Sequence, residues 1–114
     1  MILIVESGST KADWVLLDGV KTISSFQTKG WNPLFLSSEQ MILRLKSYSE
    51  LKTVFTKILE VHFYAPGCSN PSSFNDLKFS LKSVFIEANI IIESDLCAAA
   101  RSAYKDSPLF VSIL

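Results

Sequence analysis

The sequence contains few of the residues that build metal centres and disulfide frameworks. Its 114 residues include one histidine and two cysteines. The single histidine, His62, leaves almost no room for a multi-histidine metal site or a histidine-based catalytic triad. Cys68 and Cys97 stand alone, without the spacing of a zinc site or of a disulfide framework. This cysteine usage favours a reduced, cytoplasmic protein in which both cysteines are small buried side chains.

An excess of charge and a long apolar run are also missing. Lysine plus arginine equals aspartate plus glutamate, at 11 each, which argues against nucleic acid or an anionic membrane as the main partner. No apolar stretch approaches the length of a membrane span, and the first residues lack the basic start and long apolar core of a signal peptide. With 48% hydrophobic residues and a length that suits one domain, the chain is expected to be globular.

What the chain does have is an informative beginning. An apolar run over residues 2–5 stops at Glu6 and is followed by Ser-Gly-Ser-Thr-Lys at 7–11. This pattern predicts a buried strand that brings one carboxylate to its carboxyl end, then a turn and a returning strand at 12–17. Such a turn presents backbone N–H groups, hydroxyls and a lysine beside an acid, which suits a metal-bound phosphate. An ordinary hairpin with a turn of small residues fits equally well.

Alternating strand and helix patterns follow. Asp18-Gly19 predicts a tight hairpin leading into a third strand at 21–27. Ser37 and Gln40 resemble a capping box at the start of a helix over 38–48, with an extension to Thr56 left open. Apolar spacing predicts further helices at 72–85 and 96–104, and further strands at 59–64, 88–92 and 109–114. The order β-β-β-α-β-α-β-α-β predicts a mixed sheet with helices on its faces.

The end of the sequence is unusual. Residues 109–114 look like the interior of a strand, and the sequence stops there, whereas chain ends are usually polar and poorly ordered. We therefore expect the chain to be an N-terminal piece of a longer polypeptide. A short edge strand at a genuine C-terminus is the alternative.

Two acids come soon after apolar strands and are the first candidates for a site. Glu6 follows the run at 2–5, and Asp95 follows the run at 88–92. Ligands collect at the carboxyl ends of strands in open sheets, so the two acids could share one cleft. One could hold a metal through water, and the other could act as a base. Ser94 or Asp95 is also a good N-cap for the next helix, worth about 1 kcal/mol, and the two roles are compatible.

Other polar and aromatic residues have ordinary structural explanations. Asn32 precedes a proline and fits plain turn chemistry. His62 is expected to be a partly exposed structural residue on a strand. One face of that strand is expected to carry Leu59, Val61 and Phe63. Trp14 and Trp31 are expected to pack in the core rather than to serve as stacking platforms.

Four stretches, in this order and at suitable separations, resemble a known family. They are Val-Glu-Ser-Gly-Ser-Thr-Lys at 5–11, Gly-Trp-Asn-Pro at 30–33, Phe-Tyr-Ala-Pro-Gly-Cys at 63–68 and Glu-Ser-Asp-Leu-Cys-Ala-Ala-Ala-Arg at 93–101. Together they are similar to the N-terminal domain of the N-acetylglucosamine kinase type in the BadF/BadG/BcrA/BcrD ATPase family. That family belongs to the superfamily of sugar kinases, actin and heat-shock chaperone ATPases. The resemblance covers essentially the whole chain and rests on the four motifs in register.

The resemblance implies an α/β fold, namely an RNase H-like, actin-like ATPase domain with a mixed five-stranded sheet. Residues 1–114 would form the N-terminal lobe of a two-lobed kinase whose C-terminal lobe is absent. It implies ATP and Mg²⁺ as cofactors, and a small sugar such as N-acetylglucosamine as the substrate phosphorylated at its 6-hydroxyl. It also allows a homodimer formed through the absent lobe. Residues 1–114 alone are then expected to phosphorylate no sugar.

The resemblance also implies roles for individual residues. The first phosphate loop is matched by Gly8, Ser9 and Thr10, with Lys11 beside them. Asn32 matches a residue that hydrogen-bonds sugar hydroxyls. Asp95 matches the catalytic aspartate that accepts the proton of the attacking 6-hydroxyl. The strand at 109–114 matches the one that leads into the second phosphate loop.

The sequence departs from the family in three places. The usual acid of the first loop is aspartate, whereas Glu6 stands here, and its extra methylene moves the carboxylate by more than about an ångström. The resemblance implies that this acid contacts Mg²⁺ through water, and a shift of that size is enough to disturb such a contact. Ala12 replaces a threonine or similar residue, and the chain stops before the second phosphate loop.

Two other functions stay open. One is an ATPase activator of a reductase or dehydratase, the other branch of the same family. The other is a catalytically inactive sugar-binding or regulatory module, for which Glu6 is the best support.

Overall fold

A computed structural model describes residues 1–8, 10–65 and 70–93 of the chain. Within these residues the elements are, in order, β1 (Ile2–Ser7), β2 (Lys11–Asp18), β3 (Lys21–Lys29), α1 (Ser38–Ser47), β4 (Glu60–Tyr64), α2 (Pro71–Val84) and β5 (Asn89–Glu93). Outside the described residues lie Ser9, Cys68, Ser94, Asp95, Cys97, the predicted helix at 96–104 and the predicted strand at 109–114.

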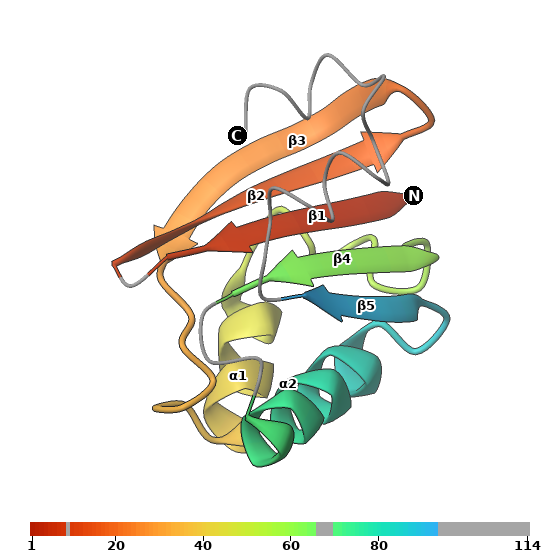
Figure 1. Cartoon of the computed structure of the whole chain (residues 1–114). Helices are drawn as coiled ribbons and strands as arrows, with labels where there is room; N and C mark the ends of the chain where they lie inside the picture. The colour runs from red at the N-terminus through yellow and green to blue at the C-terminus, as the bar shows by residue number, and fades with distance from the viewer. Residues whose placement is uncertain (9, 66–69, 94–114) are drawn as a thin grey trace.

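The described strands form one mixed sheet in the order β3-β2-β1-β4-β5 (Figure 1). β1 is antiparallel to β2 and parallel to β4, and β4 is parallel to β5. In the turn between β2 and β3, Gly19 has a φ of 65°, a conformation that glycine adopts without strain. The parallel pairs need long crossover connections, and these contain α1 and α2. The predicted mixed sheet is confirmed.

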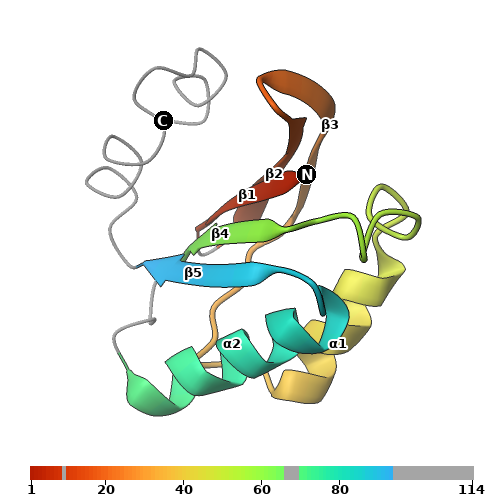
Figure 2. The same ribbon diagram turned by 90° about the vertical axis from the view of Figure 1, so that its right-hand side faces the viewer.

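Both described helices cover the same face of the sheet (Figure 2). Side chains alternate along a strand, so Leu3 and Val5 of β1 belong to the core on this face, whereas Ile4 and Glu6 lie on the other face. The core receives side chains from every described element, among them Val5, Trp14, Phe26, Met41, Leu45, Phe63, Leu77, Leu81 and Ile92. The sequence predicted helices on the faces of the sheet, and in the described part of the chain they cover one face.

The helix α1 begins as predicted and ends earlier than the open extension to Thr56. Ser37 and Gln40 form the predicted capping box. After Ser47 the chain makes a series of three-residue steps, in which the N–H of Leu51 donates to the carbonyl of Tyr48 and that of Val54 to the carbonyl of Leu51. Consecutive turns of this kind repeat buried side chains every three residues, and this spacing imitates that of a helix. The extension is therefore wrong.

The strand β4 differs from its prediction at two residues. Leu59 is not part of the described strand, which begins at Glu60, and its side chain is 57% exposed. His62 is buried rather than partly exposed, at 6%. The register of the central strands places it between Ile4 of β1 and Ile91 of β5, on the face of the sheet away from the helices. Burial lowers the pKa of His62, and the Glu60 carboxylate, 3.5 Å from its Nε2, opposes that shift.

Candidate functional site

The predicted phosphate turn is a tight connection between β1 and β2. The N–H of Gly8 donates to the carbonyl of Lys11 at 2.8 Å, so this amide is used within the hairpin. Thr10 and Lys11 are exposed and can reach a ligand. Among the described residues, a Cβ at Gly8 would meet the Lys11 carbonyl oxygen at 3.5 Å, an ordinary contact. The hairpin interpretation is confirmed, and phosphate binding by this turn stays a prediction.

The loop at 30–33 lies directly beside this turn. The N–H of Gly30 donates to the carbonyl of Thr10 at 3.0 Å. The backbone N–H of Trp31 donates to the Ser7 hydroxyl at 2.6 Å, and that hydroxyl donates to the Trp31 carbonyl at 2.8 Å. Two of the four motifs therefore meet at the end of the sheet where β1 finishes, through residues that are 24 positions apart in the sequence.

Asn32 has the turn role expected of it. Its Oδ1 accepts a hydrogen bond from the N–H of Leu34 at 3.0 Å, and its carbonyl accepts one from the N–H of Phe35 at 2.9 Å. The turn uses the side-chain oxygen, so the Nδ2 group is the part of the half-buried Asn32 side chain that can donate to a ligand. Its role toward a sugar hydroxyl stays a prediction.

The loop is held by an aromatic cluster beneath it. Trp14 and Trp31 are fully buried, which confirms that they pack in the core. The indole N–H of Trp31 donates to the Tyr48 hydroxyl at 2.8 Å, and the Arg44 side chain donates to the Gly30 carbonyl at 3.0 Å. Residues of β1, β2 and α1 thus fix the backbone on which Asn32 is carried.

Glu6 lies inside β1, not after it. It is directly opposite Asp13 of β2 and is also in register with Tyr64 of β4, which is in register with Glu93 of β5. These side chains form a row across the face opposite the helices. Burial and, secondarily, the Asp13 carboxylate raise the pKa of Glu6. Burial and Glu93 likewise raise the pKa of Tyr64.

The row relates Glu6 to the last residue of β5. Glu93 ends β5 at the same level of the sheet as Glu6 in β1. Asp95 comes two residues later in the sequence but lies outside the described residues, so its meeting with Glu6 stays a prediction. Ser7 was not among the predicted site residues. Alternation from Leu3 and Val5 places Ser7 on the buried face, and that signal was available.

The chain is similar to a protein named as a kinase. A solved structure of the "putative N-acetylglucosamine kinase" of Porphyromonas gingivalis matches it with 33% sequence identity and a TM-score of 0.77. The match covers 93% of this chain but only 38% of that protein. No known family model matches the sequence, and no curated protein matches it. Membership of the BadF/BadG/BcrA/BcrD family stays a prediction.

The donor groups at the end of β1 suit magnesium held mainly by a phosphate ligand. Mg²⁺ keeps several waters and is usually bound through one or two carboxylates together with phosphate oxygens. Among the described residues, no three metal-binding side chains gather into a ready-made site. Glu6 and Asp13 are directly opposite each other, on the strands that the turn with the exposed Thr10 and Lys11 connects, and they could supply the one or two carboxylates that such a phosphate-bound ion would need.

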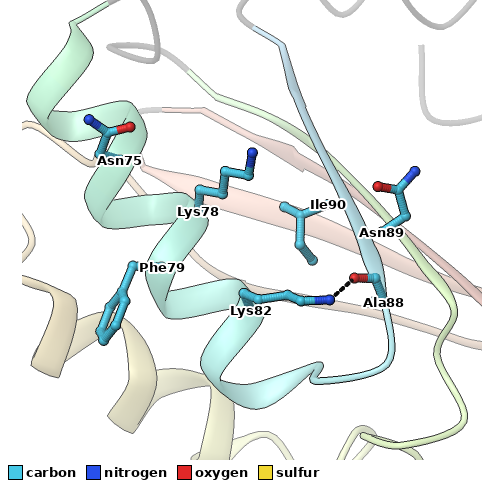
Figure 3. A pocket seen from close by; sticks show the side chains of 7 residues that line it. All are labelled: Asn75, Lys78, Phe79, Lys82, Ala88, Asn89 and Ile90. Carbon is cyan, nitrogen blue, oxygen red and sulfur yellow. Dashed lines mark hydrogen bonds between the residues drawn. The ribbon is translucent and has the colours of Figure 1, made fainter.

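A groove of about 400 Å³ lies elsewhere, between α2 and the start of β5 (Figure 3). Its lining consists of Asn75, Lys78, Phe79, Lys82, Ala88, Asn89 and Ile90. The Lys82 Nζ donates to the Ala88 carbonyl at 2.6 Å. That carbonyl belongs to the residue just before β5, so the lysine satisfies a backbone acceptor beside the strand. This contact explains the lysine structurally.

No helix in the described part of the chain is long and apolar enough to cross a membrane.

The raised pKa of Glu6 predicts that the stability of the protein depends on pH. A folded-state pKa above the unfolded-state pKa means that the folded state holds the proton of Glu6 more tightly. The resulting stabilisation is complete below the unfolded-state pKa and is lost as the pH rises through the folded-state pKa. A glutamine side chain does not titrate, so the Glu6→Gln variant lacks this loss of stability. The free energy of unfolding of Glu6→Gln minus that of the native protein should therefore increase between about pH 4 and about pH 7.

Urea unfolding at several pH values measures this difference. Glu87→Gln, at an exposed position before β5, is the control, and its difference from the native protein should change less with pH. A Glu6→Gln difference that stays constant or shrinks toward neutral pH would contradict the expectation.

Proposed function

We propose that this chain is the N-terminal lobe of an ATP-dependent kinase that phosphorylates an amino sugar such as N-acetylglucosamine at its 6-hydroxyl. In this proposal the lobe has the RNase H-like fold of actin-like ATPases. The observation that carries it is the hydrogen-bonded junction between the turn after β1 and the loop at 30–33. It brings a candidate phosphate site and a candidate sugar site to one end of the sheet. The similarity to the Porphyromonas gingivalis protein supports the same assignment.

In this proposal each residue has a role that follows from its chemistry. Thr10 and Lys11 are exposed beside the hairpin and would hold phosphate oxygens. Asn32 would donate from its Nδ2 group to a sugar hydroxyl. Asp95 would accept the proton of the 6-hydroxyl as that oxygen attacks the γ-phosphate of ATP. Mg²⁺, when bound, would offset the negative charge of the phosphates, and Glu6 would orient one of its waters.

The proposal is tested with the full-length protein, ATP, Mg²⁺ and a panel of sugars that includes N-acetylglucosamine, glucose and N-acetylmannosamine. We expect ADP formation that depends on an amino sugar, with a phosphomonoester identified by mass spectrometry. ATP hydrolysis that no sugar stimulates would favour the ATPase activator. Sugar binding without phosphate transfer would favour the inactive sugar-binding module. Either result would replace the kinase proposal.

Two substitutions test the place of Glu6 in this scheme. Glu6→Asp should keep or raise the rate of sugar phosphorylation, because it restores the shorter reach. Glu6→Ala should lower kcat/KM for Mg-ATP about tenfold or more, since a positioned charge-assisted contact is lost. The measurement is kcat/KM for ATP across a titration of Mg²⁺. If Glu6→Ala leaves the Mg²⁺ dependence unchanged, Glu6 does not contact the hydration shell of the metal.

A further inference from the structure

The Ser7 side chain connects the two parts of the candidate site through hydrogen bonds. It is the last residue of β1, it is 6% exposed, and its neighbour Gly8 begins the turn. Its hydroxyl oxygen accepts from the Trp31 N–H at 2.6 Å. Its proton has two carbonyl acceptors within reach, Trp31 at 2.8 Å and Gly8 at 3.3 Å. The shorter distance assigns the proton to Trp31.

A hydroxyl is suited to this position because it both donates and accepts. The N–H and the carbonyl of Trp31 both point to Ser7. A buried backbone group left without a partner costs about 1–3 kcal/mol. An alanine at position 7 would leave both groups unsatisfied unless the loop moved away from β1 to find water. The hydroxyl therefore fixes how close the loop lies to β1.

The residues on either side of this contact are those of the proposed site. Gly8 begins the turn that would hold phosphates, and Asn32 follows Trp31 directly. We propose that Ser7 is a positioning residue that sets the distance between the phosphate turn and the sugar-binding Asn32. This inference rests on the proposed function. An error of about 1 Å between reacting groups can lower a rate about a hundredfold, so a single buried hydroxyl at this junction can affect catalysis without touching either substrate.

The two sides of the junction should respond differently when the hydroxyl is removed. The turn keeps its own hydrogen bond, from the Gly8 N–H to the Lys11 carbonyl, so ATP binding should change little. The loop loses both bonds to Ser7 and keeps those that Gly30 makes with Thr10 and Arg44. The loop should therefore shift and displace Asn32, and this displacement should weaken the affinity for the sugar.

The test compares Ser7→Ala with Ser80→Ala in the full-length protein. Ser80 is also a buried serine, and its hydroxyl donates to the carbonyls of Asp76 in α2 and Ser38 in α1, not to the loop at 30–33. Both variants should lower the melting temperature. Ser7→Ala should also raise KM for the sugar roughly tenfold while KM for ATP stays within about twofold. Ser80→Ala should leave both KM values unchanged, because a smaller folded fraction lowers only the apparent kcat.

Arg44→Ala gives a second arm that does not depend on the folding of Ser7→Ala. Arg44 is half-buried on α1 and holds the same loop through the Gly30 carbonyl. We expect a smaller rise in KM for the sugar. An unchanged KM for the sugar in Ser7→Ala overturns the inference, and if that variant does not fold, an unchanged KM in Arg44→Ala overturns it. A native protein that phosphorylates no sugar overturns the proposed function and this inference with it, so the two failures are distinguishable.

Discussion

Replacing Asp95 by asparagine should lower kcat for sugar phosphorylation at least about a hundredfold and leave the melting temperature nearly unchanged. A general base typically contributes a factor of about 10²–10⁴ to the rate, and an amide cannot accept the proton. Asparagine, however, caps a helix about as well as aspartate does. The substitution therefore separates the two roles that the sequence allows for this residue.

The neighbouring strand supports the choice of Asp95. β5 ends at Glu93, in register with Tyr64, and so at the level of the sheet where Glu6 lies in β1. A base two residues beyond that point follows the carboxyl end of a parallel strand, where open sheets place their ligands. At the start of a helix, the helix dipole would favour the ionised carboxylate, which is the form that a base needs at neutral pH.

Glu93→Gln is the matched control for this experiment. It removes one negative charge from an exposed position two residues earlier, so it reports the effect of local charge without removing the base. We expect kcat to change less than about threefold, because an exposed charge is well screened. Both variants are measured for melting temperature and for sugar phosphorylation on one preparation. Asp95→Asn with native-like kcat would leave Asp95 as a helix cap only.

Local patterns were sufficient to predict most of the described fold. The Asp18-Gly19 hairpin and the capping box of Ser37 and Gln40 are short-range features, each fixed by a few neighbouring residues. The apolar runs of β1 and β5 and the apolar stripe of α2 are regular enough to identify a strand or a helix by themselves. These features together predicted the order of the described elements.

The predictions that were wrong came from patterns that fit more than one structure. His62 was expected to be partly exposed, because alternation distinguishes the two faces of a strand but does not tell how far either face is covered; both faces of this central strand are buried, and His62 is 6% exposed. The turns after Ser47 repeat apolar residues every three positions, as a helix nearly does. At the site, the link from Ser7 to Trp31 spans 24 positions, and no local pattern encodes such a contact.

Trp14→Ala should destabilise this domain by about 3–5 kcal/mol, the usual cost of removing a large buried aromatic side chain. The Trp14 ring stacks on Phe26 at a centroid distance of 5.6 Å. Edge-to-face contacts at 5.1–6.0 Å join it to Trp31, Tyr48 and Phe63. Its indole N–H also donates to the Thr28 hydroxyl at 2.8 Å. A typical domain is stable by only about 5–15 kcal/mol, so this one change removes a large share of the total.

Two further substitutions show whether the loss comes from the cluster. Trp14→Phe keeps an aromatic ring and loses mainly the indole hydrogen bond and part of the contact area, so it should cost less than about half as much. Phe35→Ala removes a ring that is 80% exposed and should change stability by no more than about 0.5 kcal/mol. Urea unfolding followed by circular dichroism compares all three, and in Trp14→Ala the remaining Trp31 fluorescence reports on the loop. A small cost would mean that the neighbouring side chains move to fill the cavity left by the indole ring. A cost of less than about 1 kcal/mol for Trp14→Ala would therefore show that the cluster does not hold the sheet, α1 and the loop at 30–33 rigidly together.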